Sequence, residues 1–106
     1  DRPSVCSPIH QNDINGQIAG LLASASVPAT IVNWGGDDPV DVETYCGYMG
    51  EIAGLKPRFQ RVPDAVRQTV TDNTRRRELV GDCRVKWREG LRQTIAARHP
   101  ELKLTA

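Results

Sequence analysis

His10 and Asp13 are the residues whose types and spacing come nearest to a catalytic pair in this chain. The histidine stands three residues before the aspartate, at the point where an extended segment at residues 5–9 passes into a helix. A histidine in that place could act as a general base. The stronger interpretation is structural: both side chains bond backbone groups around the start of the helix. We therefore predict no catalytic residue in this chain.

Three consecutive arginines, Arg75, Arg76 and Arg77, stand in the first turn of an expected helix. Arginines at a helix start could hold a phosphate group. The favoured alternative is that they form a solvated helix face.

Three cysteines, Cys6, Cys46 and Cys83, complete the set of reactive side chains. Their number is odd and their spacing is wide, which indicates reduced thiols in a reducing compartment. No short pairing of ligands predicts a zinc site. We expect buried thiols, no bound metal and a cytoplasmic location.

Four helices are expected to position these residues. The first begins near Asn12 or Asp13, which are good N-caps. The second begins after Asp41 and stops at Gly54. A short third helix is capped by one of residues 72–74 and ends at Gly81. The fourth runs from Trp87 to the His99-Pro100 pair.

The second helix has the clearest apolar face. Tyr45 and Met49 belong to this face, since they are four residues apart and share its helical period. We expect both side chains to pack in the core rather than to contact a cofactor.

Two strands are expected between the helices. Residues 29–34 (ATIVNW) are β-branched and apolar and are followed by two glycines, which predicts a strand buried on both faces, as in a parallel sheet. Residues 58–62 form a weaker candidate. Two strands make a poor sheet unless they pair with each other or with something outside these residues.

The composition is that of a soluble globular domain. The chain has 106 residues, of which 39% are hydrophobic and 25% charged, and its net charge is +1. This length suits a single domain spanning residues 1–106. The balanced charge argues against a nucleic-acid partner, and no apolar run is long enough to span a membrane.

Five blocks of the sequence, taken in order, resemble the extended short-chain dehydrogenase/reductase family, the NAD(P)-dependent epimerases and dehydratases. Residues 8–14 (PIHQNDI) are similar to its histidine–aspartate run, and residues 29–36 (ATIVNWGG) to its "x-Y-N-V-G-G" strand. The helix from residue 41 and the block at residues 72–81 (DNTRRRELVG) follow in register, and residues 87–95 match the closing helix. His10, Asp13, Asn33 and Asp72 are the motif positions in these blocks.

The resemblance covers only the C-terminal, substrate-binding portion of that family. It implies a helix-rich α/β lobe, with about four helices and two short strands, from a Rossmann-type enzyme. The glycine-rich half that binds NAD or NADP in the family is absent, and so is its Tyr-x-x-x-Lys pair. The resemblance therefore implies part of a longer enzyme, which binds no cofactor and catalyses no reaction by itself.

Two arginines are the candidates for binding substrate. Family members that act on nucleotide sugars carry arginines where this chain has Cys6 and Val62, so an ordinary UDP-sugar is not the expected substrate. Arg61 or Arg67 could take over after a local shift.

The expected partners are the missing Rossmann half and, in the parent enzyme, a small-molecule substrate. Apolar faces left exposed around Ile31 and Val32 would otherwise cause self-association. The alternative is a free-standing protein-interaction or ligand-binding module without enzyme activity, whose strand faces would be covered.

Overall fold

The computed structural model describes residues 4–65 and 68–105. Its elements follow in the order β1 (Val5–Cys6), α1 (Gln11–Ala23), β2 (Val40–Asp41), α2 (Val42–Ala53), α3 (Thr74–Val80) and α4 (Trp87–Arg98). The chain is therefore a helix-rich α/β domain with four helices and one two-stranded sheet in its described part. None of these helices has the length and apolarity that a membrane-spanning helix needs.

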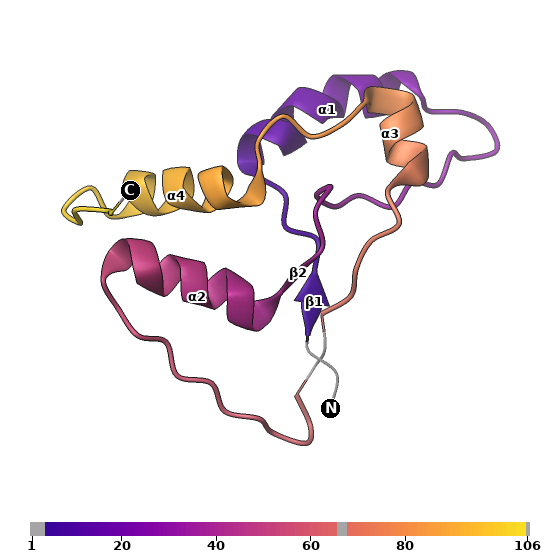
Figure 1. Cartoon of the computed structure of the whole chain (residues 1–106). Helices are drawn as coiled ribbons and strands as arrows, with labels where there is room; N and C mark the ends of the chain where they lie inside the picture. The colour runs from indigo at the N-terminus through magenta and orange to yellow at the C-terminus, as the bar shows by residue number, and fades with distance from the viewer. Residues whose placement is uncertain (1–3, 66–67, 106) are drawn as a thin grey trace.

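The helices form two pairs, one on each side of the small sheet (Figure 1). Helix α1 packs on α3, and α2 packs on α4. Between the pairs, β1 and β2 run antiparallel, with Val5 opposite Asp41 and Cys6 opposite Val40. The molecule is flat and elongated, with extents of 49 × 36 × 17 Å and a radius of gyration of 16.2 Å.

The capping prediction for α2 is confirmed. The Asp41 carboxylate accepts hydrogen bonds from the Thr44 backbone N–H and hydroxyl, both at 2.7 Å, which satisfies one of the free donors at a helix start. These bonds hold the pKa of Asp41 below its usual value. At the other end, Gly54 adopts a left-handed conformation with φ of 73°, which a side chain would strain.

The starts of α1 and α3 differ in detail from the expectation. Helix α1 starts at Gln11, and its N-cap is His10 rather than Asn12 or Asp13. Helix α3 has Asn73 at the N-cap position without a capping bond from its side chain, and the Asp72 carboxylate accepts from the Thr74 N–H instead. Both α3 and α4 end where predicted, before Gly81 and His99.

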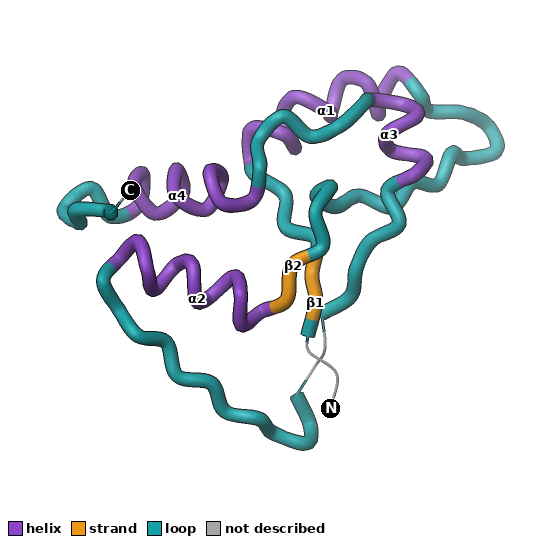
Figure 2. Tube along the Cα trace, viewed as in Figure 1, coloured by secondary structure: helices purple, strands orange, loops and turns teal. Residues whose placement is uncertain are grey.

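The predicted strands at residues 29–34 and 58–62 are wrong for this chain, since neither range is a strand. The reason is the absence of a partner: among the described residues, no backbone hydrogen bond joins either segment to a distant part of the chain. Residues 58–62 lie in the long segment between α2 and α3 that passes below the rest of the molecule (Figure 2). The sheet is built instead from β1, within the extended segment expected at residues 5–9, and from β2, where no strand was expected.

The apolar core is small. Among the described residues, the buried hydrophobic side chains are Val40, Ile52 and Leu91. The C-terminal segment folds back over α2, because the Thr105 N–H donates to the Ile52 carbonyl at 3.0 Å. Much of the tertiary structure depends on polar contacts between loops, and these contacts hold the candidate site residues.

Candidate functional site

The side chains of His10 and Asp13 each accept hydrogen bonds from backbone N–H groups, and none of the described hydrogen bonds joins one side chain to the other. The Nδ1 atom of His10 accepts a hydrogen bond from the Asn12 backbone N–H at 3.1 Å, which fixes the tautomer of the neutral ring with its proton on Nε2. The structural interpretation of His10 as a group bonding the helix start is therefore confirmed.

Asp13 serves a more distant part of the chain. Its carboxylate is 5% exposed and accepts from the backbone N–H groups of Arg84 and Val85, at 2.8 and 3.0 Å. These donors lie more than 70 residues away in sequence. Asp13 thus attaches the start of α1 to the segment that leads into α4, and it does not cap its own helix.

A second buried carboxylate, Asp37, ties the turn after residues 29–36 to α3. Arg76 is fully buried and pairs with Asp37, whose side chain is 10% exposed. The Arg76 guanidinium also donates to the carbonyls of Gly35 and Gly81, at 3.2 and 2.7 Å. The N–H of Cys83 donates to the other Asp37 oxygen at 2.7 Å.

Electrostatics at Asp37 favour the charged form of its side chain. Burial by itself raises the pKa of a carboxyl group. Hydrogen bonds from Arg76 and from the Cys83 N–H, with the positive charges of Arg76 and Arg77, outweigh burial and lower the pKa of Asp37. Because every one of these partners belongs to the chain itself, we interpret the cluster as an ion pair that holds the fold.

The expectation of a solvated arginine face is right for Arg75 and Arg77 and wrong for Arg76, which is buried. Arg75 donates to the Ile31 carbonyl at 3.1 Å, and Arg77 donates to the backbone carbonyl of Asp37 at 3.2 Å. All three guanidinium groups bind the chain itself, so they are less free to hold a phosphate. Sequence reasoning missed Asp37 and Arg76 as a pair because they are 39 residues apart.

The sequence predicted at most a helix-capping role for Asn73, but in the structure its side chain binds the Gly35–Gly36 pair. Its side-chain amide accepts from the Gly35 N–H at 3.0 Å and donates to the Gly36 carbonyl at 2.8 Å. On the other side, the Gly36 N–H donates to the Ser7 carbonyl at 3.0 Å. The block at residues 72–81 is thereby bonded to the glycine pair, which is bonded to the segment that leads to His10.

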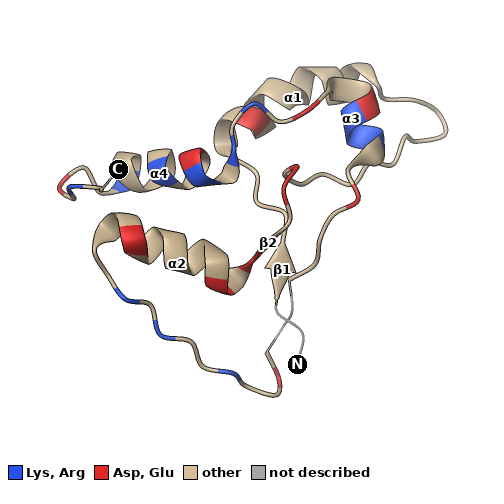
Figure 3. Ribbon diagram, viewed as in Figure 1, with Lys and Arg blue, Asp and Glu red and all other residues tan. Residues whose placement is uncertain are grey.

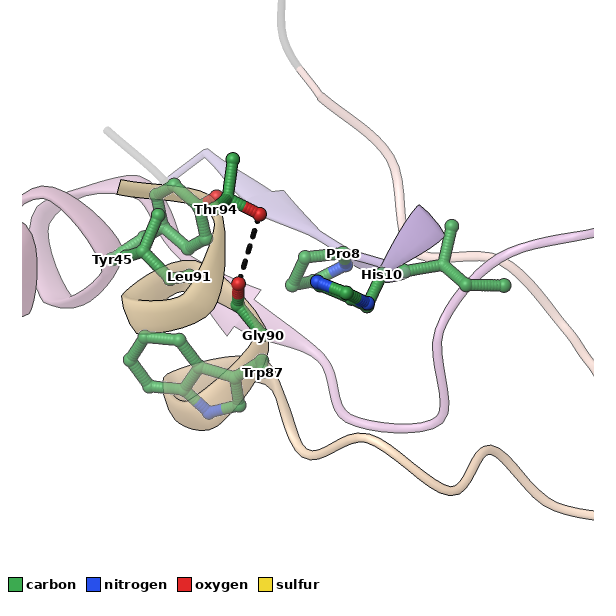
Figure 4. A pocket seen from close by; sticks show the side chains of 8 residues that line it. Pro8, His10, Tyr45, Trp87, Gly90, Leu91 and Thr94 are labelled. Carbon is green, nitrogen blue, oxygen red and sulfur yellow. Dashed lines mark hydrogen bonds between the residues drawn. The ribbon is translucent and has the colours of Figure 1, made fainter. Parts of the chain in front are cut away.

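A small hollow lies beside the His10 ring, between α2, α4 and the segment before α1 (Figure 4). It has a volume of about 50 Å³ and is lined by Pro8, Ile9, His10, Tyr45, Trp87, Gly90, Leu91 and Thr94. A space of this size suits a solvent molecule rather than a substrate.

Aromatic packing forms one wall of this hollow. Tyr45 stacks on Trp87 with ring centroids 5.8 Å apart, Tyr48 meets the same ring edge-on at 5.6 Å, and Arg88 lies over Trp87 at 4.3 Å. Burial raises the pKa of Tyr45, and the neighbouring thiols of Cys6 and Cys46 raise it further. Tyr45 is thus a neutral side chain packed between α2 and α4, which agrees with the helical period of its neighbours.

Asn33 and Asp72, two of the motif positions, are brought together across a second hollow. It measures about 370 Å³ and is lined by Ile31, Asn33, Asp72, Thr74, Arg75 and Glu78. Asp72 uses one oxygen to hold the start of α3, and hydrogen bonds from Thr74 lower its pKa. The hollow is polar and open, and it lies between residues 31–33 and α3.

Of the two candidate substrate-binding arginines, Arg61 can be placed, and it does not line this hollow. Arg61 is exposed in the segment between α2 and α3, and Arg67 lies outside the described residues. No ion pair involves Arg61 within the ranges that the structure describes.

The cysteines are half-buried and free. Burial raises the pKa of the Cys6 thiol, and the nearby Cys46 and Asp41 raise it further. Burial is also the main cause of a raised pKa at Cys83. Such thiols are poor nucleophiles. In the described part of the chain, no three side chains of the His, Cys, Asp and Glu types gather as a metal site would require.

No protein-family profile and no curated protein sequence matches this chain.

Proposed function

We propose that this chain is the substrate-binding, C-terminal part of a cytoplasmic NAD(P)-dependent epimerase, dehydratase or reductase, similar to the extended short-chain dehydrogenase/reductase family. In this proposal a Rossmann-type half outside these residues holds NAD or NADP and carries the catalytic acid or base. The present chain covers that half and shapes the substrate pocket, with Arg61 and Arg67 as the substrate-binding arginines. It is not catalytically competent alone.

The observation that carries the proposal is the mismatch between large apolar side chains and buried volume. Among the described residues three hydrophobic side chains are buried, whereas those at least a third exposed include Ile18, Leu22, Val27, Ile31, Trp34, Leu55, Phe59, Val62, Val70, Leu79 and Leu102. The radius of gyration of 16.2 Å also exceeds the roughly 13 Å of a compact domain of this length. A chain with so many exposed apolar side chains needs a second protein unit to bury them.

The polar contacts lend further support, because they hold blocks that carry the resemblance to distant parts of the chain. Asp13 bonds the segment before α4, and Asn73 bonds the Gly35–Gly36 pair. Asn73 thus joins two of the family blocks, whereas Asp13 joins its block to residues 84–85, which lie between the last two blocks. We expect such contacts if the polar groups of the blocks maintain the shape of this lobe while its apolar faces contact the Rossmann-type half.

The test is to isolate the native polypeptide that contains this sequence, measure its intact mass, and titrate it with NADH and NADPH. We expect a mass about three times the 11.7 kDa of these residues, because a dinucleotide-binding half needs that room. Binding of either dinucleotide would appear as energy transfer from tryptophan to the nicotinamide. The 106-residue chain is the control and should show no transfer.

The alternative is a free-standing interaction or ligand-binding module. It predicts a native mass of 11.7 kDa and a monodisperse protein. That result, or a longer polypeptide that binds neither dinucleotide, would overturn the enzyme proposal.

A further inference from the structure

We draw no further inference here: the strongest candidate, the exposed surface segment between α2 and α3 on which Lys56, Arg58 and Arg61 stand among apolar side chains (Figure 3), carries no proposal, because nothing in the structure shows what covers it.

Discussion

The ion pair between Asp37 and Arg76 offers the sharpest test of what holds this fold together. Replacing Asp37 by asparagine keeps the size of the side chain and removes its charge. Arg76 is fully buried, so the substitution leaves a guanidinium group inside the protein without its counter-charge. Breaking a buried pair from one side costs about 3–5 kcal/mol.

Details of the structure place the expected loss near the lower end of that range. Arg76 keeps two carbonyl acceptors, Gly35 at 3.2 Å and Gly81 at 2.7 Å. The Cys83 N–H, which donates at 2.7 Å to the Asp37 oxygen Oδ2, can still find the amide oxygen of the substituted side chain in one of its two orientations. We therefore expect the free energy of unfolding to fall by about 3 kcal/mol.

Urea unfolding followed by tryptophan fluorescence measures the effect, with Asp82→Asn as the matched control. Asp82 pairs with Arg77, at 3.6 Å, but is 79% exposed, so its loss should stay within about 0.5 kcal/mol. Equal losses in the two variants, or a loss below about 1 kcal/mol at Asp37, would refute the reasoning that burial decides the strength of this pair.

The pH dependence provides a check that needs no large loss of stability. Because the pKa of Asp37 is lowered in the folded state, its contribution to stability is fully present above the unfolded value of about 3.9. It is lost as the pH falls through the lower, folded value. The Asp37→Asn variant should therefore lose less stability than the parent between about pH 4 and pH 2. An identical acid response would contradict the assignment.

Two other substitutions test the remaining polar and steric contacts. Asp13→Asn should lower the free energy of unfolding by about 2 kcal/mol, because the buried Asp13 carboxylate accepts two backbone N–H bonds. The control is Asp64→Asn, at an exposed position, which should change the free energy of unfolding little. Thermal unfolding of both variants measures the difference. Gly36→Ala should lower the Tm sharply, since the added methyl would meet the backbone carbonyl of Pro8, which has no rotamer to move away. Gly47→Ala is the control, because nothing lies within 4 Å of a Cβ atom added at that position in α2. The higher helix propensity of alanine should raise the stability of this variant by up to about 1 kcal/mol. A lower Tm for Gly47→Ala, or an unchanged Tm for Gly36→Ala, would show that the packing is misassigned.

Structure that depends on neighbouring residues could be read directly from the sequence. Helix α2 follows from apolar spacing, and its start and stop follow from Asp41 and Gly54. Helix α4 has the bounds expected from Trp87 and from the His99-Pro100 pair. Caps and helix ends act within one turn of the chain, so their signals are readable from adjacent residues. The packing of Tyr45 against α4 agrees with the same periodicity.

Which distant groups meet depends on the folded chain. The sequence predicted that Asp13 would bond the start of its own helix and that Arg76 would lie on a solvated face. In the structure, each side chain instead binds backbone groups of a loop many residues away. The sequence also predicted a strand at residues 29–34, and the alternation of its side chains agrees with that pattern, yet no strand lies beside it among the described residues. A strand exists only with a partner, and an ion pair only where the fold brings two charges together, so neither can be derived from a local pattern.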